Sequence, residues 1–279
     1  MAEEHYYFVY VGGKIKRITP TITSILNKGI QHSILSNFFE INVEFETKLP
    51  VHVGTGEIDC SFEEKRNQCY CVRKHVKKNG YLIIPGSTVK GVLSTYFLAL
   101  FKDNYEVSFL FGAPGYQSRV IVEDFISESK PVIEESPKQW KPHRYKPGSI
   151  KLYKPVDKYH DHEKILCLEC IPKDATIKGK IIVLNSNEEE VAKIILALGY
   201  MPKEEKEHSY QMGYLMIGYG KGKGFGKIML KKESLSIVKY DSQDYFSSGV
   251  NVTNGVMEKA VLLFDKVLRN VWNDVFRER

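Results

Sequence analysis

The order in which the hydrophobic pattern changes along the chain limits its fold more than any other feature. Residues 41–46 alternate apolar and polar side chains, which is the period of a half-buried strand. After Pro85 and Gly86, apolar residues follow the i, i+3, i+4, i+7 spacing of an amphipathic helix, with Ser87 as a suitable N-cap. This first pair of elements predicts a helix that packs on a sheet.

Further segments continue the alternation of strands and helices. Residues 119–125 and 176–184 are rich in β-branched side chains and predict two strands. Residues 188–198 predict a second helix that ends at Gly199, and residues 227–238 predict a last strand with one interruption. The β-α-β-β-α-β order predicts an α+β protein with the ferredoxin-like arrangement, which RNA-recognition modules also use.

The core of residues 41–238 is interrupted by two long insertions and is flanked by a segment at each end. Residues 1–40 form an N-terminal extension, residues 57–80 form an inserted loop, and residues 127–175 form a second insertion. Connections of this length usually carry function or a small structure of their own. Residues 239–279 form a C-terminal segment, and its apolar stripe predicts one terminal helix docked on its own domain.

Composition indicates a folded protein of the cytoplasm. The 279 residues are 43% hydrophobic and 27% charged, which excludes disorder and fibrous repeats. The chain starts without a signal-peptide pattern, and no apolar run reaches about 18 residues, so we expect neither secretion nor membrane spanning. Five cysteines are an odd, low count, which argues against a disulfide framework and for a reducing compartment.

Positive charge is concentrated in two segments, although the net charge is only +6. Residues 138–158 contain seven Lys or Arg and one Asp, and residues 219–232 contain five Lys and no acid. Two basic surfaces on a near-neutral body favour a polyanionic partner such as nucleic acid. A solvated lysine face is the alternative for either cluster alone.

The second basic segment overlaps a run of five alternating glycines, GYGKGKGFG at 218–226. Without Cβ atoms the backbone can approach phosphates closely, and Lys221 and Lys223 flank it with positive charge. The run matches neither the P-loop nor the dinucleotide-binding pattern, and it precedes a strand. It predicts a phosphate-binding loop of another kind, with a flexible glycine turn as the alternative.

The start of the first helix, IPGSTVKG at 84–91, has a similar chemistry. Its free N–H groups, the Ser87 hydroxyl and Lys90 together predict an anion site. A helix that is simply well capped is the alternative.

Cysteine and histidine residues also allow a zinc site to be considered. The residues concerned are Cys69, Cys71, Cys167 and Cys170, with His75, His160 and His162 nearby. An extended strand would send Cys167 and Cys170 to opposite faces, whereas a zinc knuckle needs both on one turn. We therefore expect buried free thiols rather than structural zinc.

Taken together, these motifs resemble the RAMP superfamily of CRISPR-associated proteins. The resemblance rests on LPVHVGTG at 49–56, IPGSTVKG, LFG at 110–112 and the glycine run, in this order over residues 41–232. The chain is most similar to backbone subunits of type III (Csm-like or Cmr-like) effector complexes, which implies a modified RNA-recognition fold that polymerises along a guide RNA. The implied partners are guide RNA, target RNA, other CRISPR effector subunits, and copies of itself or paralogous RAMP subunits.

The resemblance implies two groups of RNA-binding residues. The guide backbone would contact Ser87, Lys90, Gly220, Lys221, Gly222, Lys223, Gly224 and Gly226. A thumb within residues 127–175 would contact the guide–target duplex through Tyr153, Lys154, Lys158 and Tyr159. Aromatic side chains among lysines suit base stacking and phosphate binding, with a solvated loop as the alternative.

For catalysis the resemblance implies Asp59, in the sequence Gly56-Glu-Ile-Asp59 after the first strand. A loop carboxylate there would act as a base or bind Mg²⁺ or Mn²⁺ during cleavage of target RNA. The spacing from Asp59 to Pro85 is longer than in the family. Either the loop carries an insertion, with Glu63 and Glu64 as substitutes, or the subunit is catalytically silent.

Two rival functions follow from the same motifs. A silent assembly or end-capping RAMP subunit would bind guide RNA and its neighbours without cutting. A precursor-processing RAMP endoribonuclease would need a general-base histidine, for which His32 and His52 are the near candidates. The IPGS helix start disfavours this enzyme.

Overall fold

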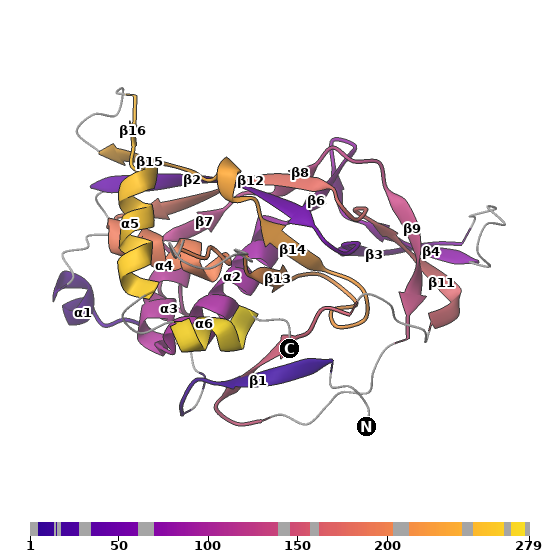
Figure 1. Cartoon of the computed structure of the whole chain (residues 1–279), viewed down its shortest axis with the longest axis horizontal. Helices are drawn as coiled ribbons and strands as arrows, with labels where there is room; N and C mark the ends of the chain where they lie inside the picture. Colours follow the sequence, from indigo (N-terminus) through magenta and orange to yellow (C-terminus); the bar gives the residue numbers. More distant parts are fainter. Residues whose placement is uncertain are drawn as a thin grey trace, which may run out of the picture.

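Helices and strands are mixed throughout the computed structural model, which confirms the α+β class (Figure 1). The structure describes residues 5–13, 15, 18–27, 35–60, 70–138, 146–156, 162–202, 212–241, 248–264 and 269–276. No helix among these residues is long and apolar enough to cross a membrane.

A large sheet forms the centre of the molecule. Its neighbouring strands are, in order, β13 (Tyr214–Met216), β14 (Lys227–Leu230), β2 (Asn37–Thr47), β12 (Thr176–Leu184), β8 (Phe125–Ser127), β6 (Tyr81–Ile84) and β5 (Lys77–Lys78). In addition, β15 (Ser236–Asp241) pairs with β2, β16 (Val250–Asn251) pairs with β15, and β7 (Val120–Val122) pairs with β12. The four strands expected from the sequence thus lie in the order fourth, first, third, second, with antiparallel pairing throughout.

The predicted strands are confirmed with local differences. The third is confirmed at Thr176–Leu184, and the first is longer than predicted. The second is divided into β7 and β8, and the carboxylate of Asp124 between them accepts a hydrogen bond from the Gly86 N–H at 3.0 Å. The predicted interruption of the fourth strand is a 3₁₀ turn, η1 (Lys232–Ser234), between β14 and β15.

Helices gather on one side of the large sheet. They are α2 (Gly86–Phe101), α3 (Asn104–Phe111), α4 (Glu188–Ala197), α5 (Thr253–Leu263) and α6 (Arg269–Phe276), drawn below β2, β12 and β8 in Figure 1. A short helix, α1 (Ile22–Asn27), lies at one end. Along β2, Ile41, Val43 and Phe45 are buried and alternate with half-buried polar residues, as predicted. Burial of this apolar face is the main force that joins helices and sheet.

The C-terminal segment docks on its own domain, as predicted, but the expectation of one terminal helix is wrong. It forms α5 and α6, separated by residues outside the described part. Val256 and Trp272 are buried in the core, and the ring of Phe276 stacks on Tyr96 with centroids 5.3 Å apart.

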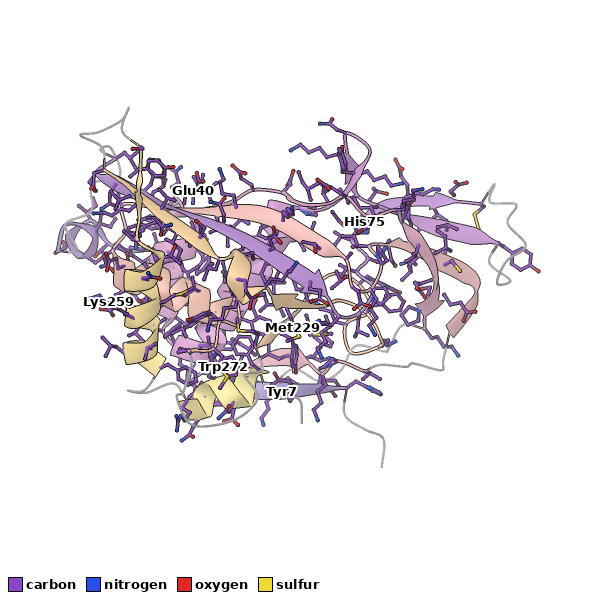
Figure 2. All side chains as sticks on the ribbon, turned by 45° about the horizontal axis from the view of Figure 1, so that its top comes forward. Tyr7, Glu40, His75, Met229, Lys259 and Trp272 are labelled. Atoms are coloured by element: carbon purple, nitrogen blue, oxygen red, sulfur yellow. A yellow bond between two sulfur atoms is a disulfide. The ribbon has the colours of Figure 1, made fainter. Side chains whose placement is uncertain are left out.

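The N-terminal extension contributes a strand to a separate two-stranded ribbon. β1 (Tyr6–Tyr10) pairs antiparallel with β10 (Ser149–Tyr153) of the second insertion. The Tyr7 hydroxyl donates a hydrogen bond to the Val275 carbonyl of α6, and Figure 2 shows Tyr7 beside Trp272. The extension therefore packs against α6.

The two insertions combine into a second sheet beyond one end of the large sheet (Figure 1). Its strands are, in order, β3 (Gly54–Asp59), β4 (Cys71–His75), β11 (His162–Cys170) and β9 (Val132–Pro137). The pairing of β4 with β11 is parallel, and the other two pairings are antiparallel.

Disulfide bonds in this second sheet contradict the expectation of free thiols. Cys60 and Cys71 are disulfide-bonded, and Cys167 also belongs to a disulfide. Among the described cysteines, Cys170 is free and buried. The cysteine count misled because the pairing of β3 with β4, which sets Asp59 opposite Val72, brings Cys60 and Cys71 together. The cysteines therefore no longer support a reducing compartment.

Candidate nucleic-acid interface

A pocket of about 330 Å³ brings together three of the segments that the sequence singled out. It is lined by Ser87, Thr88, Gly91, Val92, Thr95, Tyr96, Lys151, Leu152, Tyr153, Met216, Gly218 and Lys221. These residues come from the first three turns of α2, from β10, and from β13 and the glycine run that follows it. The pocket therefore combines two lysines with hydroxyl groups and aromatic rings.

The start of α2 differs from its prediction. Pro85 is the N-cap and makes no side-chain capping bond, so the expectation that Ser87 caps the helix is wrong. A Cβ on Gly86 would lie 2.0 Å from the Val122 carbonyl oxygen, so the close approach of α2 to β7 requires glycine here. This close contact accounts for the Pro-Gly pair.

The predicted anion site at this helix start already has an acid beside it. The Asp124 carboxylate accepts the Gly86 N–H and pairs with Lys78 Nζ at 2.9 Å. The Lys78 hydrogen bond and the Gly86 N–H hold the pKa of Asp124 below its ordinary value. Ser87 nevertheless lines the pocket. Lys90 lies on α2 but is not among the residues that line it.

The glycine run is a compact loop whose backbone excludes other residue types. All five glycines have positive φ, between 72° at Gly220 and 86° at Gly224. A Cβ would meet the His52 carbonyl oxygen at 2.3 Å from Gly218, and the Ile217 carbonyl oxygen at 2.1 Å from Gly226. The alternating glycines are thus required by conformation and packing, and the loop is packed against the protein.

The two lysines of this loop have different surroundings. Lys221 lines the pocket, and burial lowers its pKa. Lys223 is only 5% exposed. Of the two lysines expected to bind phosphate, Lys221 therefore lines the pocket and Lys223 is buried.

Of the predicted thumb residues, Tyr153 lies at the glycine loop. Lys221 Nζ is 5.3 Å from the centroid of its ring, and a Cβ on Gly222 would lie 3.3 Å from that ring. The backbone N–H of Lys154 donates to the His5 carbonyl at 3.0 Å. Lys158 and Tyr159 fall outside the described residues. The structure thus unites Tyr153 with the glycine loop, which sequence reasoning had assigned to a separate role.

Lys151 was missed by sequence reasoning, although it lines the pocket beside Tyr153. The signal was the alternation of SIKLY, which places residues 151 and 153 on one face of a strand. Burial lowers the pKa of Lys151 and raises that of Tyr153. Both side chains are therefore partly desolvated at the edge of the pocket.

Asp59 lies on β3 and not in a loop. Its carboxylate pairs with Lys74 Nζ at 2.9 Å, and this hydrogen bond raises the pKa of Lys74. Mg²⁺ prefers several oxygen ligands, but the described residues contain no group of three or more His, Cys, Asp or Glu side chains that could hold a metal ion. The described surroundings of Asp59 do not fit a Mg²⁺ or Mn²⁺ site. Glu63 and Glu64 lie outside the described residues.

A buried cluster joins the second sheet to the glycine loop, and Figure 2 places His75 where the second sheet begins. His75 Nδ1 accepts the Val53 N–H at 3.2 Å, and its Nε2 lies 2.9 Å from the Ile83 carbonyl oxygen, which requires a neutral ring that donates from Nε2. Burial lowers the pKa of His75 to about 4. Its ring contacts His52, with centroids 5.8 Å apart.

His52 links this cluster to the loop through both its ring and its backbone. Its Nδ1 lies 2.7 Å from the Glu169 carbonyl oxygen, and its own carbonyl accepts the Tyr219 N–H at 2.9 Å. Burial lowers the pKa of His52. His52 is only 2% exposed, which leaves its ring poorly placed to reach a substrate as a general base and disfavours the precursor-processing alternative. His32 lies outside the described residues.

Comparison with known proteins agrees with this assembly of motifs. A search of curated proteins finds no match. A family model described as the RAMP superfamily matches residues 44–229, which is more than half of the chain and includes β12, α2 and the glycine run. The chain therefore belongs to the RAMP superfamily, and this membership indicates a CRISPR-associated RNA-binding subunit.

Proposed function

We propose that this protein is a guide-RNA-binding backbone subunit of a type III CRISPR effector complex, in which it contacts copies of itself or paralogous RAMP subunits. The observation that carries the proposal is the pocket where Ser87, Tyr153 and Lys221 meet. Three motifs far apart in the sequence, each expected to contact RNA, converge there. A structural role would not require lysines, hydroxyls and an aromatic ring to share one open pocket.

We also assign the large sheet to the ferredoxin-like fold. The support is the strand order fourth, first, third, second with antiparallel neighbours, and the helices on one side. This is the arrangement that a β-α-β-β-α-β chain produces when both crossovers pack on the same face.

Within the pocket, binding would rely on the RNA backbone. Lys151 and Lys221 supply positive charge, and Ser87 and Thr88 supply hydroxyl donors at the start of α2. Burial removes part of the water around both lysines, and RNA phosphates would replace it with charge-assisted hydrogen bonds. Such contacts carry little sequence information, so we expect affinity to depend on salt and hardly on guide sequence.

Fluorescence anisotropy of labelled single-stranded RNA across a salt series tests this. Lys221→Ala should weaken binding and flatten the salt dependence by about one ion. Lys173→Ala, on the exposed loop between β11 and β12, is the control and should leave both unchanged. Salt-independent affinity, or equal effects of the two variants, would contradict the proposal.

Co-purification tests the biological assignment. RNA bound to the complex isolated from its host should be full-length guide. Precursor hairpins would support the processing alternative instead, and absence of RNA would contradict all three functions.

For cleavage, the surroundings of Asp59 favour the silent alternative. Lys74 neutralises the Asp59 carboxylate, and the Cys60–Cys71 disulfide follows it directly. A carboxylate held in this way is a weak base and a poor metal ligand. We therefore propose RNA binding and assembly without target cleavage through Asp59.

A further inference from the structure

The two-stranded ribbon of β1 and β10 has one face packed on the core and an opposite face that is largely half-buried, with Tyr10 exposed at its end. Val9 of β1 and Ile150 and Leu152 of β10 are buried. Because paired residues of an antiparallel ribbon share a face, the register places Tyr6, Phe8 and Tyr10 of β1 on the opposite face, with Tyr153 and Lys151 of β10. These five residues are called the aromatic ribbon face.

Lysines lie over the rings of this face. Lys151 Nζ is 3.9 Å from the centroid of Tyr6 and 5.1 Å from that of Tyr153. Lys146 Nζ is 5.9 Å from the centroid of Phe8. The face is therefore a row of aromatic rings with ammonium groups between them.

The two segments that carry this face contain no acid. Residues 5–13 and 146–156 contain no Asp or Glu, although the chain as a whole has 34 acids against 40 Lys and Arg. Tyr10 is 64% exposed, and its ring packs beside Gly148, where a Cβ would lie 3.0 Å from it. The side chain is thus both accessible and held in place.

The aromatic ribbon face is continuous with the pocket. Lys151 and Tyr153 belong to both, and Tyr153 also contacts the glycine loop. A ligand that leaves the pocket beside Tyr153 meets Tyr6 and Phe8 next. Single-stranded nucleic acid combines regularly spaced phosphates with flat bases. This combination matches a basic surface on which lysines alternate with aromatic rings.

We infer that the N-terminal strand β1 extends the RNA-binding surface, with bases stacking on Tyr10 and Phe8 while phosphates contact Lys151 and Lys146. This inference rests on the proposed function, because the RNA in the pocket is the molecule that continues onto β1. Since every base has a flat face, the contact would tolerate any sequence.

The test compares variants of the full chain in their affinity for labelled single-stranded RNA of mixed sequence. Phe8→Leu with Tyr10→Leu keeps apolar side chains but removes both rings, and should weaken binding by about tenfold. Tyr81→Leu is the matched control, because Tyr81 is a 50% exposed tyrosine on β6 of the large sheet. It should bind as the wild type does, and thermal unfolding should show all variants folded.

Photo-crosslinking of the wild-type protein gives a second measurement that needs no variant. RNA containing 4-thiouridine should crosslink to the peptide containing residues 6–10. If wild-type protein binds RNA but crosslinks map elsewhere and the double variant keeps its affinity, the inference is wrong and the proposed function stands. If the double variant loses a partner subunit and not RNA, the face is a protein contact and the inference is wrong. If wild-type protein binds no RNA, the proposed function fails as well.

Discussion

The glycine loop and the second sheet show two different ways in which this chain builds structure. In the loop, each of the five glycines has a positive φ, so the local sequence dictates the backbone. In the second sheet, four strands from two insertions pair across about a hundred residues of sequence, and a disulfide crosses β3 and β4. The loop depends on which residue types are present, whereas the sheet depends on distant pairing.

This difference separates the two kinds of functional expectation. Residues placed by the loop and by the start of α2 reach the pocket, as Lys221 and Ser87 do. Asp59, placed by the second sheet, lies on a strand and pairs with Lys74. We therefore expect substitutions in the loop to destabilise the protein through local backbone strain. In the second sheet, we expect destabilisation when a link between distant segments is removed.

The largest effect is expected for Gly226→Ala in the loop. The positive φ of 84° and a Cβ only 2.1 Å from the Ile217 carbonyl oxygen should together cost about 4 kcal/mol of unfolding free energy. Gly115→Ala is the control, because Gly115 has a φ of 75° but no atom within 4 Å of its Cβ position, and should cost only about 1 kcal/mol. Urea unfolding measures both. Equal losses would show that conformation alone, and not packing, selects glycine in the loop.

The second-largest loss of stability is expected in the second sheet, when Cys60 and Cys71 are both replaced by Ser. Loss of a cross-link over a sequence separation of 11 should destabilise the pairing of β3 with β4 by about 3 kcal/mol. Amide hydrogen exchange in these strands should accelerate by roughly a hundredfold, with β2 and β12 as internal controls. Unchanged exchange in β3 and β4 would show that pairing alone holds this sheet.

A smaller effect of pH is expected at the junction between the two regions. The folded-state pKa of His75 is about 4, below its ordinary value of 6.5, so protonation favours the unfolded chain as pH falls through this window. Between about pH 7 and about pH 5 the protein should lose about 2 kcal/mol of stability from this group. Urea unfolding of wild type and His75→Gln across this range measures the difference in slope. Identical slopes would mean that His75 does not stay neutral in the folded protein.

The smallest effect is expected for Asp59→Ala. Its ion pair with Lys74 is about one-third exposed on both sides, so its removal should change stability by less than about 1 kcal/mol. Target-RNA cleavage by the assembled complex with Mg²⁺ should be the same for wild type and variant. If the variant complex assembles but no longer cleaves, the proposal that this subunit does not cut through Asp59 is wrong. The second sheet would then carry a catalytic residue that the sequence had predicted.

Much of the central architecture was predictable because it depends on periodic patterns. The alternation in β2, the strand at Thr176–Leu184 and the helix of α4 with Gly199 after it all follow from spacing that the chain displays locally. The site was predictable in part. Ser87, Lys221 and Tyr153 do line one pocket, but Lys223 is buried, Lys90 lies outside the described lining, and Lys151 was missed.

By itself, then, the sequence determined the α+β class, the main strands and helices, and the family. Those properties depend on side-chain periodicity and on allowed backbone angles, which neighbouring residues set. Only the tertiary structure decided that β1 joins β10, that the insertions form one sheet with a Cys60–Cys71 disulfide, and that Asp59 meets Lys74. These contacts join segments whose meeting depends on how the whole chain packs, and no local pattern encodes which distant residue will lie opposite another.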